Sequence, residues 1–263
     1  MPEVLVAAGE CNVTEIYRIG GAQAIAALAF GTESIKNVDK ITGPGNAYVA
    51  AAKKLVFGVV GIDMIAGPTE VVIVADETAV PKFAAADLIA QAEHDEEASP
   101  ICLTTSAAFA RELELEVTRQ LETADRRAIA QRAFNTNGVI AIVKDLNQAA
   151  KIVNELAPEH LEVMVKRSRA FVNKIRNAGS IFVGDWSTEA MGDYIVGTNH
   201  TLPTSGTARF SSALSVYDFL KFTNVIELSR TRFETLAPSV EVLAQAEKLF
   251  GHADSVRIRR RKI

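Results

Sequence analysis

The run Val71-Val-Ile-Val-Ala75, followed after a turn at Pro81 by a helical pattern that ends near Glu93, decides the fold. Its apolar, β-branched residues predict a strand, and the longer pattern after it predicts a helix. The same order recurs at short apolar runs in residues 15–19, 40–42, 101–105, 139–143 and 180–183. Repeated strand–helix units predict an α/β fold with a parallel sheet and helices on both of its faces.

The length of the chain and its last part indicate how the fold is divided. With 263 residues, of which 48% are hydrophobic, the chain can bury a large core and form about two domains. From about residue 232 to 250 there is one helical pattern without a strand partner, formed by Leu236, Val240, Leu243, Ala244 and Leu249. We therefore expect a helical tail after the α/β part.

The composition argues against several classes of protein. A formal net charge of -4, from 28 basic and 32 acidic residues, argues against nucleic-acid binding as the main role. The basic run at residues 257–262 is typical of a solvated tail, although it could contact RNA or an acidic partner. Cys11 and Cys102 lack CxxC spacing, which indicates a reducing compartment. Without a signal pattern or an apolar run of about 20 residues, we expect a cytoplasmic protein with no membrane partner.

Three glycine-rich turns are candidates for binding a phosphate group. They are Gly20-Gly-Ala-Gln23, Gly43-Pro-Gly-Asn46 and Ala66-Gly-Pro-Thr-Glu70. Ligands of parallel sheets bind at the carboxyl ends of the strands, and we expect the turns to lie there. Glycine permits close backbone approach to a phosphate, and the carboxamides of Gln23 and Asn46 would add donors and acceptors. None of the turns is a full GxGxxG motif, so ordinary tight turns are the alternative.

The histidines suggest a metal site. Four of them lie in polar, turn-rich surroundings: His94, His160, His200 and His252. Gln91 and His94 are three residues apart, so on a helix they face the same way, and their oxygen and nitrogen atoms suit zinc. Two ligands are too few, and Asp193 and His252 are candidates to complete a catalytic zinc site with an open position. The alternative is that each histidine is an ordinary surface or core residue.

Glu159 and His160 form a second candidate site. They follow Pro158, which restricts Ala157 and is expected to end the preceding helix. An adjacent acid and imidazole can act as two proton acceptors, one for a substrate and one for water. Neighbouring residues on a strand point to opposite faces, so both reach one ligand only from an irregular segment. The alternative is that Glu159 caps a turn and His160 lies at a strand edge.

Several stretches, in order along the whole chain, resemble the histidinol dehydrogenase family. They are residues 20–28, Gly43-Pro-Gly-Asn46, residues 62–70, Ala90-Gln-Ala-Glu-His-Asp95, Ala157-Pro-Glu-His-Leu-Glu162, Gly192-Asp-Tyr194 and residues 197–212. The resemblance is to the family rather than to a shared fold. It implies the oxidation of L-histidinol to L-histidine in two NAD-dependent steps through an aldehyde, with Zn²⁺ and NAD as cofactors.

The resemblance also implies a role for each candidate residue. His160 would take protons from the alcohol and then from the hydrate, and Glu159 would activate the attacking water. Zinc would be bound by Gln91, His94, Asp193 and His252 of the partner subunit in a homodimer. NAD would be contacted by Gln23 and Asn46. The substrate would be contacted by the zinc ligands and His160, and also by Thr69, His200 and Glu247. Thr69 stands where the family commonly has serine, and it keeps the hydroxyl group.

The family has a long N-terminal portion ahead of the segment that matches Met1, including half of its catalytic domain and a tyrosine that contacts NAD. The resemblance therefore implies incomplete Rossmann-like domains with a helical C-terminal tail. Residues 1–66 would belong to a nucleotide-associated domain, 67–214 to a partial catalytic domain that binds zinc and substrate, and 215–263 to a dimerisation tail. We expect a fragment, a truncated reading frame or one piece of a split enzyme. Two alternatives stay open: a non-catalytic remnant that binds zinc and dimerises, and a dehydrogenase of another amino alcohol.

Overall fold

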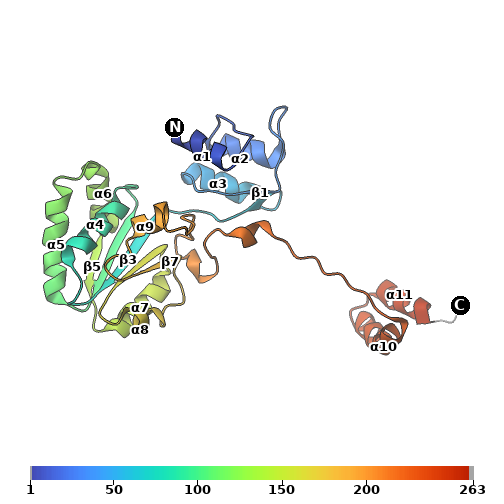
Figure 1. Ribbon diagram of the computed structural model, residues 1–263. Helices are drawn as coiled ribbons and strands as arrows, with labels where there is room; N and C mark the ends of the chain where they lie inside the picture. Colours follow the sequence, from blue (N-terminus) through green and yellow to red (C-terminus); the bar gives the residue numbers. More distant parts are fainter. Residues whose placement is uncertain (1, 261–263) are drawn as a thin grey trace. The chain divides into compact units, whose positions relative to one another are not determined.

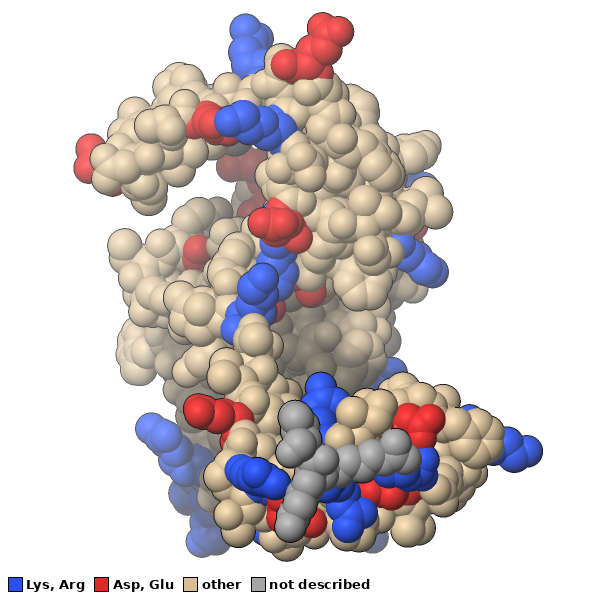
Figure 2. Space-filling view, turned by 90° about the vertical axis from the view of Figure 1, so that its right-hand side faces the viewer, with Lys and Arg blue, Asp and Glu red and all other residues tan. Residues whose placement is uncertain are grey.

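The structure is a computed structural model that describes residues 2–260 (Figure 1). The chain divides into two compact units, Met1–Phe219 and Leu220–Ile263. On the face shown in Figure 2, basic side chains are interspersed with acidic ones. This mixture follows from the near balance of 28 basic and 32 acidic residues in the sequence.

A five-stranded, all-parallel sheet forms the centre of the first unit (Figure 1). The strands lie in the order β5 (Val139–Ile142), β4 (Ser99–Thr104), β3 (Glu70–Ala75), β6 (His160–Met164) and β7 (Ser180–Val183). Each of Val71, Val72, Ile73, Val74 and Ala75 in the middle strand is at most 1% exposed. The predicted parallel α/β fold is confirmed, and the apolar run of β3 is buried, as expected for a strand covered on both faces.

Helices cover both faces of this sheet. On one face, Val71, Ile73 and Ala75 pack against α4 (Pro81–Ala92), α5 (Ala107–Leu121) and α6 (Arg127–Asn137). On the other face, Val72 and Val74 pack against α7 (Leu146–Leu156) and α8 (Ser168–Val172). A short helix, α9 (Glu189–Tyr194), follows β7 and contacts α4. Alternate residues of β3 therefore belong to two separate apolar cores, as the two-residue period of a strand requires.

A smaller α/β layer precedes the main sheet in the first unit. It contains α1 (Pro2–Glu10), α2 (Gly21–Phe30), β1 (Lys40–Ile41), α3 (Ala47–Val56) and β2 (Gly61–Ile62). The two short strands are parallel, and Ile25, Ile41 and Val60 contribute to the core between them and the helices. A buried ion pair joins Lys53 of α3 to Asp63, whose side chains are 2% and 1% exposed. This ion pair fixes the turn between β1 and α3.

The predicted strand at residues 15–19 is wrong. That segment is irregular, and Ile16 and Ile19 are 51% and 44% exposed. Its short apolar run is typical of a strand, but among residues 2–260 no strand pairs with it. A strand needs a neighbour for its backbone hydrogen bonds, and the pattern alone does not provide one.

The second unit contains two helices, α10 (Arg230–Ala246) and α11 (Phe250–Arg260). A single helical segment was predicted there. The helix breaks because Lys248 takes a left-handed conformation with φ 61°, so the chain turns back. Arg260 Nη1 lies 2.7 Å from Glu241 Oε1, which pairs part of the basic run with α10. Among the helices of the described chain, none has the length and apolarity needed to cross a membrane.

Candidate functional site

A cavity of about 180 Å³ in the first unit collects most of the predicted site residues. Six of them line it: Thr69, His94, Glu159, His160, Asp193 and His200. Thr69 directly precedes β3, Glu159 directly precedes β6, and His160 is the first residue of β6. The site therefore lies at the amino ends of these strands.

The expectation of a site at the carboxyl ends of the strands is wrong for this cavity, whereas the turn at residues 43–46 does follow the carboxyl end of β1. The rule for carboxyl ends holds where strands lead into the N-termini of helices that bind the ligand. Here the polar groups come from the segments that enter β3 and β6, from the region just after α4, and from α9. The glycine turn at residues 66–70 likewise enters a strand, and Gly43 and Asn46 lie between β1 and α3 in the smaller layer.

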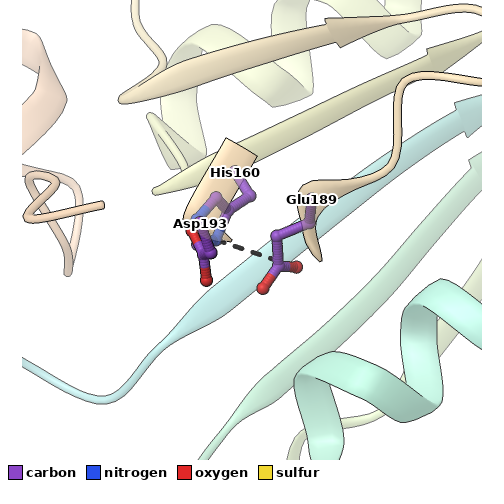
Figure 3. A group of neighbouring side chains, drawn as sticks. All are labelled: His160, Glu189 and Asp193. Carbon is purple, nitrogen blue, oxygen red and sulfur yellow. Dashed lines mark ion pairs between the residues drawn. The ribbon is translucent and has the colours of Figure 1, made fainter. Parts of the chain in front are cut away.

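The imidazole of His160 is buried among three carboxylates (Figure 3). Its Nδ1 lies 3.7 Å from Glu159 Oε2 and 3.9 Å from Glu189 Oε2. Its Nε2 lies 3.8 Å from Asp193 Oδ1 and is buried without a hydrogen-bond partner among the described residues. Burial lowers the pKa of His160, but the neighbouring Asp193, Glu189 and Glu159 outweigh it, so that the pKa is raised. The imidazole is thus a strong proton acceptor with one nitrogen available to a ligand.

Glu159 is held in place by hydrogen bonds from the segment that enters β3. Its Oε2 accepts from Thr69 Oγ1 (2.6 Å) and from the Glu70 backbone N–H (3.1 Å). The backbone carbonyl of Glu159 accepts from the Ser180 N–H at the start of β7 (2.9 Å). Glu159 and His160 both reach the cavity because Glu159 lies in the loop before the strand rather than on it, as an irregular segment allows.

Gln91 lies on α4 with no exposed surface, next to Glu189. The amide orientation that satisfies its neighbours has Nε2 donating to Glu189 Oε1 (2.9 Å) and Oε1 accepting from the Glu70 N–H (3.3 Å), an assignment made from the hydrogen-bond network. Burial raises the pKa of Glu189 to about 7. Sequence analysis did not select Glu189. The available signal is its position four residues before Asp193, which places both on one side of α9.

The donor atoms around His160 fit a bound divalent cation. His160, Glu189 and Asp193 each offer one ligand-type atom, and these atoms lie within 4.8 Å of one another (Figure 3). This set shares Asp193 with the predicted zinc ligands, and His94 lines the same cavity. Imidazole nitrogen together with carboxylate oxygen is a donor set that zinc accepts.

The remaining predicted residues lie outside this cluster. His252 is in α11 and Glu247 is the C-cap residue of α10, both in the second unit. Gln23 is exposed in the first turn of α2. Asn46 is exposed and caps α3, because its Oδ1 accepts from the N–H groups of Tyr48 and Val49 (3.1 Å each). Its carboxamide nitrogen remains available to a ligand.

Gly179 shapes the site by its lack of a side chain. A Cβ at this position would lie 2.5 Å from the backbone oxygen of Glu159 and 3.2 Å from Pro203 Cδ. We expect Gly179→Ala to lower the free energy of unfolding by about 1–3 kcal/mol, because backbone atoms must move to admit the methyl group. Urea unfolding measures this change. Gly9→Ala in α1 is the control, because a Cβ there meets nothing within 4 Å; equal stabilities for the two variants would contradict the close approach.

The fold and the cavity define an α/β protein with a polar site suited to proton transfer. The sequence model of the family "Histidinol dehydrogenase" matches residues 1–260. Histidinol dehydrogenase of Bacillus cereus is 54% identical over 258 residues, which cover 98% of this chain and 60% of that protein. The enzyme of Gluconobacter oxydans is 55% identical over 261 residues, covering 99% and 61%. The chain belongs to the histidinol dehydrogenase family.

A solved structure agrees with this assignment. The crystal structure of histidinol dehydrogenase from Elizabethkingia anophelis has a TM-score of 0.92 and 41% sequence identity to this chain. The match covers 98% of this chain and 60% of that one. The chain thus spans about 60% of the length of the relatives that it matches.

Proposed function

We propose that this chain carries out the zinc-dependent, NAD-linked oxidation of L-histidinol to L-histidine through L-histidinaldehyde. The main support is the cavity in which His160 lies 3.7 Å from Glu159 and 3.8 Å from Asp193. Membership in the histidinol dehydrogenase family supports the choice of substrate.

His160 is the proposed proton acceptor of both steps. It takes the hydroxyl proton of the alcohol and later a proton of the aldehyde hydrate, while a hydride leaves the same carbon each time. Its carboxylate neighbours stabilise the imidazolium that forms, which is the effect that raises its pKa. Between the two steps the first proton must leave His160, and the exposed side of the cavity lets it pass to solvent.

Glu159 is the proposed base that activates the water attacking the aldehyde. One of its oxygens is occupied by Thr69 Oγ1 and the Glu70 N–H, so the carboxylate is held in one orientation. Because this fixed carboxylate lies next to the proton-accepting imidazole, the oxidation of the alcohol and the attack of water on the aldehyde can take place at the same point of the cavity. Thr69 and His200, which line the cavity, are the proposed substrate contacts, together with Glu247.

Zinc would be bound by Gln91, His94, Asp193 and His252 of the partner subunit in a homodimer. NAD would be contacted by Gln23 and Asn46. When bound, NAD accepts the hydride of each step and zinc supplies a positive charge that orients the amine and imidazole of the substrate. Glu189 supports Gln91 in this role, because it accepts from Nε2 and so fixes the orientation of the carboxamide.

The test is NADH formation by the purified chain with L-histidinol, compared with other amino alcohols and repeated with and without added zinc. We expect L-histidinol to be the best substrate and zinc to be required. Faster oxidation of another amino alcohol would show that this alcohol, and not L-histidinol, is the substrate. Zinc binding and dimerisation without any NADH would favour a non-catalytic binding module.

The shared zinc ligand gives a separate prediction. We expect His252→Ala to weaken zinc binding by at least about 100-fold. Loss of a residue that binds the metal directly should weaken binding more than loss of a residue that only hydrogen-bonds to a metal ligand. Zinc content after dialysis against a competing chelator measures this. Arg260→Ala, on the same helix, is the control, and unchanged zinc affinity in the His252 variant would rule out this ligand.

A further inference from the structure

Two carboxyl groups near the site, buried Glu162 and half-buried Asp87, take no part in the proposed chemistry. Glu162 is on β6, two residues after His160, so both side chains point to the same face of the sheet. It is 1% exposed. Asp87 is on α4, four residues before Gln91 and therefore on the same side of that helix. After burial, each of the two carboxyl groups also shifts the pKa of the other.

The hydrogen bonds of this pair are unequal. Glu162 Oε1 accepts from the backbone N–H of Glu189, at 2.8 Å. Glu162 Oε2 and Asp87 Oδ2 are buried and have no donor among the described residues. Burial raises the pKa of both carboxyl groups.

Helix α9 depends on this contact because its own sequence supplies no cap. It has only six residues, and the side chain of its N-cap residue, Thr188, makes no capping hydrogen bond. The first N–H groups of a helix need acceptors from outside it, and a helix this short is not stable by itself. Glu162 supplies an acceptor to Glu189, the first residue of α9.

We propose that Glu162 and Asp87 form a positioning pair that fixes the amino end of α9 and thereby places Glu189 and Asp193 on either side of the His160 imidazole. The importance of that placement for turnover rests on the proposed function. The pair itself does not depend on that function: Glu162 accepts from the first N–H of α9, and Asp87 of α4 lies next to Glu162.

The test compares Glu162→Gln with Glu162→Met. Glutamine keeps an oxygen for the Glu189 N–H and places an NH₂ donor toward Asp87, so we expect hydrogen exchange of the Glu189 amide to stay within about twofold of the unchanged chain. Methionine has a similar shape and no such acceptor. We expect it to speed exchange of this amide by about tenfold or more, since a buried donor loses its partner. NMR-detected hydrogen exchange and the amide shifts of Glu189 and Asp193 measure both effects.

Glu155→Gln and Glu155→Met are the controls, because Glu155 is on α7 with a side chain 66% exposed. A Glu189 amide that stays protected in Glu162→Met, or that loses protection equally in Glu162→Gln, would overturn the positioning pair. If the methionine variant does not fold, loss of Glu189 protection in the glutamine variant is by itself enough to overturn the pair. Zinc affinity and NADH formation are recorded separately, so loss of activity in the unchanged chain would count against the proposed function and not against the pair.

Discussion

His160→Ala is expected to lower the rate of NADH formation from L-histidinol by about 10²–10⁴-fold, the usual contribution of a positioned proton acceptor. The imidazole is the buried group that lies between Glu159, Glu189 and Asp193, whereas the other two histidines that line the cavity, His94 and His200, are exposed. Zinc content should stay nearly unchanged, because the proposed zinc ligands are Gln91, His94, Asp193 and His252. Steady-state kinetics and metal analysis of the same sample measure both quantities.

The control is His200→Ala, which removes an exposed histidine from the same cavity. As a substrate contact, His200 should affect KM more than kcat. Loss of zinc in His160→Ala in parallel with loss of activity would overturn the role of His160 as a proton acceptor and would make it a metal ligand instead.

Lys53→Met is expected to lower the free energy of unfolding by about 3–5 kcal/mol, because it leaves the carboxylate of Asp63 buried without its counter-ion. Lys53 Nζ pairs with Asp63 Oδ1 and donates to the Gly43 carbonyl (2.8 Å), and Asp63 Oδ2 accepts from the Gly43 N–H (2.7 Å). The change should therefore also loosen the turn that leads to Asn46. Urea unfolding measures the stability of each variant.

Lys54→Met is the matched control, since Lys54 is the next residue of α3 and is exposed. It should change the stability by less than about 0.5 kcal/mol. The double variant Lys53→Met/Asp63→Asn should recover part of the loss, because a neutral amide keeps an acceptor for Gly43 without a buried charge. If Lys53→Met is as stable as the unchanged chain, the ion pair contributes no net stability.

The middle of the fold could be predicted because β3 is an uninterrupted apolar run buried on both faces. β6 is equally buried, but its sequence contains His160 and Glu162, so its composition does not indicate a buried strand. His160 is tolerated there because Glu189 and Asp193 lie beside its imidazole, and Glu162 because it accepts from the Glu189 N–H. Such partners depend on tertiary packing, which a single sequence does not show.

The site could be predicted in part. Glu159 and His160, Thr69 and His94 were selected from adjacent polar residues, from spacing and from the family resemblance, and they line one cavity. Glu189 lies on a six-residue helix, too short for a periodic pattern to mark it. The position of the cavity at the amino ends of β3 and β6 was not predicted, because the general rule for parallel sheets points to the opposite ends.

The central claim is that the cavity beside His160 oxidises L-histidinol, and the most direct measurement is the amount of NADH formed for each L-histidinol consumed by the purified chain with zinc and excess NAD. We expect two NADH for each molecule and L-histidine as the product, since the alcohol and the aldehyde hydrate each give up one hydride. NADH formation no greater than that of His160→Ala would contradict the claim.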